Sequence, residues 1–91
     1  GLLELNKIIL NQEKIIVQND SKINPPVYIG KRCHIGKNVT LGPFVSIGND
    51  VYIGDNVKLK NSLILNNSKI LQNQNISDSL IDENENIISL K

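Results

Sequence analysis

The stretch PVYIGKRCHIGKNVTLGPFVSIGNDVYIGDNVKLK, residues 26–60, repeats one pattern every six residues. Each unit carries an Ile or Leu and a smaller apolar residue two positions earlier, and in five successive units a Gly follows directly. The Ile/Leu series extends beyond the stretch and comprises Ile23, Ile29, Ile35, Leu41, Ile47, Ile53, Leu59, Leu65 and Leu71. The earlier apolar positions are Val27, Cys33, Val39, Val45, Val51, Val57 and Leu63. Self-similarity at a fixed period indicates a repeat architecture.

A period of six fits short strands joined by corners. Strand alternation turns the Ile/Leu and the residue two before it to one face, and the remaining residues form a corner. Three units close a triangular coil of about 18 residues, and coils stacked about 4.8 Å apart pair as parallel strands. Each fully buried aliphatic side chain then contributes roughly 1.5–3 kcal/mol. Gly, and the corner residues Asn38, Asp50 and Asn56, suit tight corners that need positive φ or no Cβ.

The composition agrees with one small aliphatic domain. The chain has 91 residues, 40% of them hydrophobic but only 3% aromatic. Ten basic and nine acidic side chains give a net charge of +1, which argues against a strongly basic nucleic-acid binder. One Cys and one His exclude an internal disulfide and an ordinary zinc cage. No apolar run approaches the roughly 18 residues of a membrane-spanning helix. Because the chain opens on Gly1 without Met, we expect a fragment of a longer protein.

The two ends depart from the repeat. Near the start, Leu2, Leu5 and Ile9 fall at helical spacing, which predicts a short helix to about Leu10. Residues 1–13 are therefore interpreted as a linker helix and turn, and residues 14–91 as the β-helix domain. At the other end, Lys69 occupies an expected inward position and the six-residue step is lost beyond Leu71. The segment DSLI at 78–81 repeats NSLI at 61–64 seventeen residues earlier. We therefore expect an irregular last coil over about 72–91 with a shortened corner, as terminal solenoid repeats are usually atypical.

Several segments resemble the sugar-1-phosphate nucleotidyltransferases. Residues 2–7 (LLELNK) resemble the helix that follows their catalytic domain, and residues 26–30 (PVYIG) resemble the opening of their C-terminal repeats. Residues 42–48 (GPFVSIG) resemble their G-P-x-x-S-I-G unit. Residues 61–65 (NSLIL) and 78–81 (DSLI) resemble paired segments of the long-form glucose-1-phosphate thymidylyltransferases. The resemblance covers nearly the whole chain, and the order of helix, repeats and late D-S-L-I segment is its most specific part.

The resemblance implies an all-β fold, a left-handed parallel β-helix of about three to four coils with a short N-terminal helix. The left hand comes from the resemblance, since general rules favour right-handed crossovers. The implied parent is a cytoplasmic enzyme that makes a nucleoside-diphosphate sugar of the dTDP-glucose type from a nucleoside triphosphate and a sugar-1-phosphate. Its Gly-rich loop and Mg²⁺-binding carboxylates lie in a separate catalytic domain. This sequence lacks such a loop, so no catalytic, cofactor-binding or metal residue is assigned here, and Mg²⁺ is expected only in the missing domain.

The implied role of the fragment, inactive alone, is a scaffold, an oligomerisation surface or a regulatory platform. The main alternative is a hexapeptide acyltransferase domain that acetylates amino sugars with acetyl-coenzyme A. That activity needs an extra-coil loop supplying His or Asn and ordinarily more coils, which the sequence does not show. A γ-class carbonic anhydrase also uses this fold but needs three His, so the single His of this chain argues against that function. The repeats alone are equally typical of a purely structural solenoid from an unrelated assembly.

Two residues inside the repeats are candidate reactive groups. His34 is the only conventional general base, but it precedes Ile35, so strand alternation points it outward as a solvated or interface side chain. Cys33 falls on an inward position and is predicted to be a buried structural thiol rather than a nucleophile.

Charged and aromatic side chains suggest surfaces. Three basic residues cluster around the early corners and would suit a phosphate-bearing ligand such as the coenzyme A tail, although solubilising charge is the favoured interpretation; they are Lys31, Arg32 and Lys37. Four acidic residues near the C-terminus lack calcium-loop spacing and indicate a solvated end cap; they are Asp78, Asp82, Glu83 and Glu85. The aromatics Tyr28, Phe44 and Tyr52 lie off the inward columns. They predict a protein–protein contact, a homo-oligomer (trimer or dimer) through a flat β-helix face, with no nucleic-acid or membrane partner.

Overall fold

The computed structural model describes residues 8–10, 16–17 and 20–90, and in these ranges it contains strands and no helix. The strands are β1 (Ile8–Leu10), β2 (Ile16–Val17), β3 (Lys22–Ile23), β4 (Val27–Ile29), β5 (His34–Ile35), β6 (Thr40–Leu41), β7 (Val45–Ile47), β8 (Tyr52–Ile53), β9 (Lys58–Lys60), β10 (Ser62–Ile64), β11 (Lys69–Ile70), β12 (Asn75–Ser77), β13 (Ser79–Ile81) and β14 (Ile87–Ser89). Every third strand returns to the same side of the body, so the chain forms a solenoid of about four turns.

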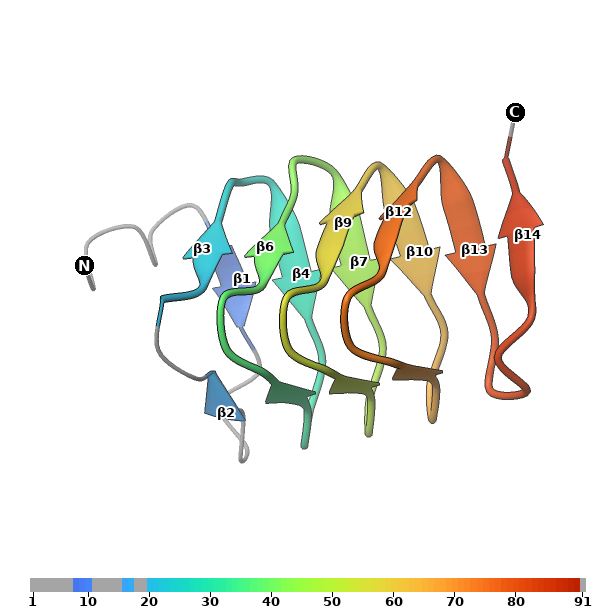
Figure 1. The fold of residues 1–91 in the computed structure, drawn as a ribbon, viewed down its shortest axis with the longest axis horizontal. Coiled ribbons are helices and arrows are strands. Elements are labelled where there is room, and N and C mark those ends of the chain that lie inside the picture. The colour runs from blue at the N-terminus through green and yellow to red at the C-terminus, as the bar shows by residue number, and fades with distance from the viewer. Residues whose placement is uncertain (1–7, 11–15, 18–19, 91) are drawn as a thin grey trace.

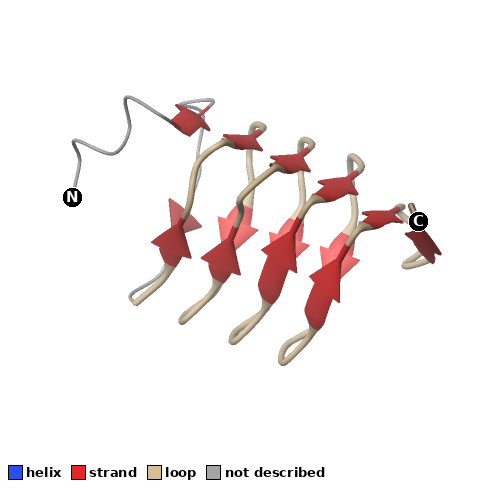
Figure 2. Ribbon diagram, turned by 90° about the horizontal axis from the view of Figure 1, so that it is seen from above, coloured by secondary structure: helices blue, strands red, loops and turns tan. Residues whose placement is uncertain are grey.

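The strands form three parallel sheets that make the three sides of the solenoid. One sheet has six strands in the order β1-β4-β7-β10-β13-β14, and the others are β11-β8-β5-β2 and β12-β9-β6-β3. All strand pairs are parallel except β13–β14, where the chain turns back on itself. The chain runs up the strands nearest the viewer and down those behind as it advances toward the C-terminus (Figure 1), which makes the coil left-handed, as expected. Figure 2 shows the coils stacked side by side.

The core consists of aliphatic columns inside the coils. The inward positions alternate with outward ones in each strand, as in β4, where Val27 and Ile29 are buried and Tyr28 is exposed. The fully buried side chains include Ile29, Ile35, Leu41, Ile47, Ile53 and Leu59, as the six-residue period predicts. Ile23 is partly buried and packs against this cluster.

The predicted series is wrong after Leu59. Leu65 and Leu71 are 38% and 51% exposed, and the residues just before them, Ile64 and Ile70, are buried instead. Leu41 pairs with Leu59 at a distance of 18 residues, whereas Val45 pairs with Ser62 at 17. One residue is therefore lost between Leu59 and Ser62.

This deletion shifts the residues that follow by one position, and a second short corner between β12 and β13 shifts the end of the chain once more. The first deletion places Lys69 and Leu63 outside rather than inside. It comes one coil earlier than the shortened corner expected within 72–91, which the structure also contains, between β12 and β13. The pairing of β10 with β13 confirms the 17-residue repeat of NSLI and DSLI.

The corner residues adopt left-handed backbone conformations. Positive φ occurs at Arg32, Asn38, Phe44, Asp50 and Asn56, among others. Of the corner glycines in the described residues, only Gly42 has positive φ, and the others fit the second predicted reason, the absence of a Cβ. The remaining glycines that follow the aliphatic positions are required because the next coil lies too close to admit a Cβ.

At the N-terminus, most of the predicted helix lies outside the described residues. Its last three residues, Ile8–Leu10, form strand β1, which pairs with β4, so the prediction is wrong there. Among the described residues, no helix has the length and apolar character needed to cross a membrane.

Candidate interaction faces

Each sheet presents one outer face, and the three faces differ in chemistry. We call the outer surface of the six-stranded sheet face A, that of the sheet containing β5, β8 and β11 face B, and that of the sheet containing β6, β9 and β12 face C. The assignments follow from strand alternation, because the outward residues of neighbouring strands are in register.

Face A is uncharged along its central row. Its outward residues are Tyr28, Ser46, Leu63, Leu80 and Ile88, aligned by the pairings of β4, β7, β10, β13 and β14. The small Ser46 lies between Tyr28 and Leu63 in this row. A shallow groove of about 270 Å³ follows that gap, bordered by Phe44 at the neighbouring corner. Tyr28, Phe44 and Leu63 are all exposed, so an apolar strip with a notch at Ser46 crosses the face.

Face B carries a stacked column of side chains. His34 and Tyr52 are in register on β5 and β8, with ring centroids 5.0 Å apart and planes inclined by 8°. Lys69 of β11 places its Nζ 5.9 Å from the Tyr52 ring centroid, a distance at which an ammonium is attracted to the ring. The column gives face B a mixed aromatic and cationic surface.

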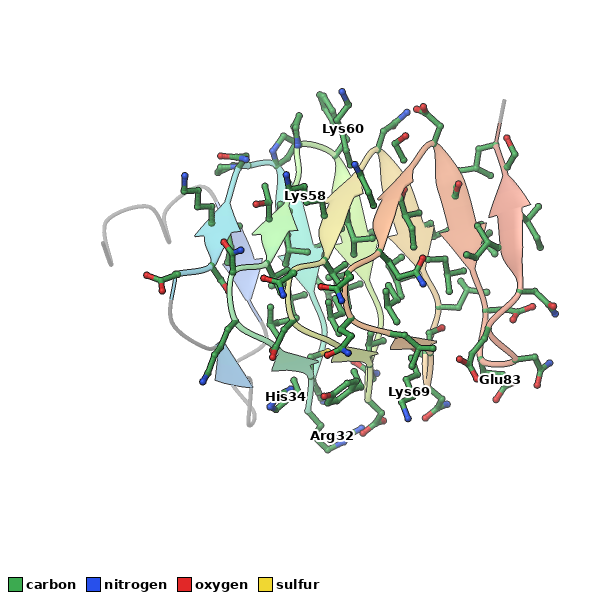
Figure 3. All side chains as sticks on the ribbon, viewed as in Figure 1. Arg32, His34, Lys58, Lys60, Lys69 and Glu83 are labelled. Carbon is green, nitrogen blue, oxygen red and sulfur yellow. The ribbon has the colours of Figure 1, made fainter. Side chains whose placement is uncertain are left out.

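Face C is polar and basic. Its outward row consists of Lys22, Thr40, Lys58 and Asn75, aligned by the pairings of β3, β6, β9 and β12. Lys58 and Lys60 lie in the upper part of the view in Figure 3, and His34 and Lys69 lie in the lower part, so the two pairs are on different sides of the solenoid. Faces B and C both carry lysines in their outward rows, whereas the outward row of face A carries no charge. Face A is therefore the side that best suits an apolar contact.

The two candidate reactive groups have structural roles. Cys33 is buried, as predicted, and its thiol donates to the carbonyl oxygen of Gly48 at 3.1 Å. Burial raises the pKa of the Cys33 thiol, so the nucleophilic thiolate is disfavoured. His34 points outward, as predicted, but its Nδ1 is buried without a hydrogen-bond partner, and its ring is stacked on Tyr52.

The basic cluster is divided between two corners. Lys31 and Arg32 lie at the corner between β4 and β5, and Lys37 lies at the next corner, between β5 and β6. Arg32 donates from Nε and Nη2 to both carboxylate oxygens of Asp50, at 2.7 and 3.0 Å. The hydrogen bond from Arg32 holds the pKa of Asp50 below its usual value. The ordinary charged-surface interpretation fits this arrangement.

The acidic stretch organises the last turn. Asp82 accepts hydrogen bonds from the backbone N–H groups of Asn84 and Asn86 at 2.9 and 3.0 Å and from the Asn86 side chain at 3.1 Å. The bond from the Asn86 backbone is the main reason that the pKa of Asp82 is lowered. Within the described part of the chain, no three His, Cys, Asp or Glu side chains gather closely enough to hold a metal ion.

A family model described as the GMPPB C-terminal domain matches residues 23–90. The chain belongs to this family. It is a C-terminal domain of sugar-1-phosphate nucleotidyltransferases, in agreement with the resemblance seen in the sequence. The match begins at β3 and ends after β14, so it includes all three faces.

A solved structure is also similar, a mutant of perosamine N-acetyltransferase from Caulobacter crescentus in complex with CoA and GDP-perosamine. The identity is 11% and the TM-score is 0.34, over 89% of this chain and 53% of that chain. The chain thus spans about half the length of that enzyme. No curated protein matches this chain by sequence.

Sequence reasoning identified part of face A and missed the rest. Tyr28 and Phe44 were found because aromatics stand out in an aliphatic repeat. Leu63 was assigned to the interior because the six-residue count was carried through the lost residue. The 17-residue repeat of NSLI and DSLI was the available signal, since it fixes Leu63 and Leu80 as equivalent positions.

Proposed function

We propose that this β-helix is the C-terminal domain of a cytoplasmic enzyme that makes a nucleoside-diphosphate sugar, and that it holds copies of the enzyme together through face A. The reaction joins a nucleoside triphosphate to a sugar-1-phosphate and releases pyrophosphate. Membership of the GMPPB C-terminal domain family over residues 23–90 is the observation that supports the parent activity. The domain itself contributes position and association rather than chemistry.

The character of face A supports self-association. Its central row carries no charge, so the row itself adds no like-charge repulsion between two copies, although Glu83 lies beside it. Exposed aromatic and aliphatic residues surround the Ser46 notch, and aromatic anchors in a depression are typical of interface hot spots. The body measures 33 × 23 × 20 Å, so one broad side covers at most about 750 Å², close to the roughly 800 Å² per partner of a standard interface.

Sedimentation equilibrium of the 91-residue chain tests this association. We expect a dimer or trimer for the natural chain and a shift of at least about tenfold toward monomer for Leu63→Lys, because a buried unpaired charge costs several kcal/mol. Asn75→Lys on face C is the matched control, since it adds the same charge to an exposed outward strand position. Equal effects of the two variants, or a monomeric natural chain at millimolar concentration, would reject face A as the interface.

The specific product is a further part of the proposal. The NSLIL and DSLI segments resemble those of glucose-1-phosphate thymidylyltransferases, which supports dTDP-glucose. The test is pyrophosphate release by the full-length parent, with glucose-1-phosphate and each nucleoside triphosphate in turn. We expect dTTP to be used best. Preference for another nucleotide would remove this specificity while leaving the domain assignment, and no transfer with any nucleotide or sugar-1-phosphate would overturn the assignment.

The acetyltransferase alternative makes a different prediction. It requires turnover of acetyl-coenzyme A with an amino-sugar acceptor such as glucosamine-1-phosphate by the 91-residue chain. The sequence shows no extra-coil loop that would supply a catalytic His or Asn, and the ring of His34 is stacked on Tyr52, so we expect no turnover. Acetyl transfer that is lost in His34→Ala would favour the alternative instead.

A further inference from the structure

An open groove of about 620 Å³ lies on face B, at the edge where this face meets the next corner. Its walls come from two successive coils, from β8 and β11 and from the corner residues that follow each strand. The lining residues are Tyr52, Gly54, Asp55, Lys69, Leu71 and Gln72. This volume falls within the range of about 300–1,000 Å³ that is typical of small-molecule sites, so the groove has room for one compact ligand.

The groove holds one cation and one anion in fixed places. The ammonium of Lys69 lies over the Tyr52 ring, 5.9 Å from its centroid, and that ring is stacked on His34. The carboxylate of Asp55 is held at its corner, because Oδ1 accepts the Lys37 backbone N–H at 2.9 Å. Among the described residues, neither Lys69 nor Asp55 forms an ion pair. Both charges are therefore available to a ligand, and their fixed positions reduce the entropy that is lost on binding.

The Tyr52 ring is closed to stacking by a flat ligand. The strand order β11-β8-β5 places Lys69 and His34 on opposite sides of Tyr52. The His34 ring covers one face at a centroid distance of 5.0 Å, and the Lys69 ammonium lies over the other. A nucleobase binds chiefly by stacking on an aromatic face, so it has no platform here, and only the edge of Tyr52 contributes to the groove.

The other lining groups suit a sugar that carries one anionic group. The Gln72 amide both donates and accepts hydrogen bonds, and the second carboxylate oxygen of Asp55 accepts hydroxyl donors in charge-assisted bonds. Leu71 is 51% exposed and offers apolar surface to C–H groups. The Lys69 ammonium suits a phosphate group, which it binds through charge-assisted hydrogen bonds.

We propose that this groove binds a sugar monophosphate, with the phosphate on Lys69 and the sugar hydroxyls on Asp55 and Gln72. The choice of ligand rests on the proposed function, because the parent enzyme uses a sugar-1-phosphate, but the site lies on the β-helix and not in the catalytic domain. Asp55 repels a phosphate from its end of the groove, which fixes the orientation of the ligand. Because the groove is open and has one cation, we expect a dissociation constant in the millimolar range.

Amide chemical shifts of the 91-residue chain, followed by NMR during ligand titrations, test this site. The ligands are glucose-1-phosphate, glucose, inorganic phosphate and dTDP-glucose. We expect glucose-1-phosphate to shift the amides of the lining residues. It should bind about fivefold more tightly than glucose or inorganic phosphate, which is the effect of one exposed charge pair. The base of dTDP-glucose finds no open ring face, so this ligand should bind no more tightly than glucose-1-phosphate.

Two variants separate the two ends of the ligand. Lys69→Gln should reduce the affinity for glucose-1-phosphate to that for glucose, because the phosphate loses its cation. Asp55→Asn keeps the oxygen that accepts the Lys37 N–H but loses the charge, so it should weaken the binding of glucose without weakening that of inorganic phosphate. Lys58→Gln on face C is the matched control, since it removes the same charge from an outward strand position, and it should leave all affinities unchanged.

The amide spectrum of each variant also confirms that its coils remain folded, so a loss of binding reports on the groove. The proposal would be overturned by unshifted lining amides well above millimolar glucose-1-phosphate, or by equal losses in Lys69→Gln and Lys58→Gln. Binding of inorganic phosphate or dTDP-glucose more tightly than glucose-1-phosphate would also overturn it. Any of these results leaves pyrophosphate release by the full-length parent as a separate measurement, so failure of this site is distinguished from failure of the proposed function.

Discussion

Two kinds of residue shape each corner, and their reasons differ. Asn38, Asn56 and Asn73 take left-handed φ, which Asn tolerates better than most residues. Their side chains also form a ladder along the solenoid, with hydrogen bonds of 2.9 Å from Asn38 to Asn56 and 3.1 Å from Asn56 to Asn73. Gly36 has no such φ, and it is required by contact with the coil that follows.

Gly36→Ala should therefore destabilise the fold by at least about 1 kcal/mol, as overpacking does. A Cβ at Gly36 would lie 2.5 Å from Oδ1 of Asp55 and 2.8 Å from the carbonyl carbon of Gly54. Asp55 cannot simply move aside, because that oxygen accepts the Lys37 backbone N–H at 2.9 Å. Denaturant unfolding measures the change, with Ser46→Ala on face A as the control. A stability equal to that of the natural chain would show that the coils separate more easily than the structure indicates.

The Arg32–Asp50 pair predicts a specific acid dependence. The pKa of Asp50 is lower in the folded chain than its usual value because Arg32 donates hydrogen bonds to it. Its stabilising contribution is therefore complete above the unfolded-state pKa of about 4 and is lost as the pH falls through the folded-state pKa. We expect Asp50→Asn to reduce the loss of melting temperature between neutral and acidic pH. Because the pair is exposed, the effect is small, and an unchanged pH profile would show that Arg32 contributes nothing through this carboxylate.

At the scale of elements, the corner between β9 and β10 sets the register of the rest of the chain. The equivalent corner between β6 and β7 contains one residue more. Asn61 takes positive φ there, and Asp78 does the same one coil later, where Asn61 Nδ2 donates to Asp78 Oδ1 at 2.5 Å. The shortened corner is thus repeated in two successive coils, which keeps the strands of face A aligned.

The register shift predicts opposite outcomes for two adjacent residues. Ile64→Ala should lower the free energy of unfolding by about 2–5 kcal/mol, the usual cost of a cavity in a core, because Ile64 is 1% exposed. Leu65→Ala should cost less than about 1 kcal/mol, since surface substitutions have small effects. Chemical denaturation of both variants provides the comparison. If Leu65→Ala lowered the free energy of unfolding more than Ile64→Ala, the result would contradict the register shift and favour an uninterrupted six-residue period.

For the whole molecule, the distribution of charge over three sides decides where association occurs. The outward row of face A is neutral, face B carries His34 and Lys69, and face C carries Lys22 and Lys58. Interactions between exposed charges are screened by salt, whereas burial of apolar area is not.

Association through face A should therefore be nearly independent of salt. Between low salt and about 0.5 M NaCl, we expect the dissociation constant of the natural chain to change by less than about threefold, measured by sedimentation equilibrium. A steep salt dependence of the natural chain would indicate a charged interface in place of face A.

The sequence alone predicted the solenoid, its inward columns as far as Leu59, the buried thiol of Cys33 and the outward position of His34. The period of six predicts these features because every coil has the same narrow triangular interior, which aliphatic side chains must fill at the same positions. It failed after Leu59 because a residue lost at a corner leaves the local apolar pattern nearly intact. NSLIL contains apolar residues at three successive positions, and only pairing with the coil below decides which one faces inward.

The sequence thus determined the architecture and the family of this protein, because the six-residue period and the aliphatic composition can be read directly from the order of the residues. Tertiary structure decided the register beyond the shortened corner and the formation of face A. These features depend on which residues lie above one another when coils of 18 and 17 residues are stacked. That alignment is a property of the packed solenoid, since each strand finds its partners one full turn away along the chain.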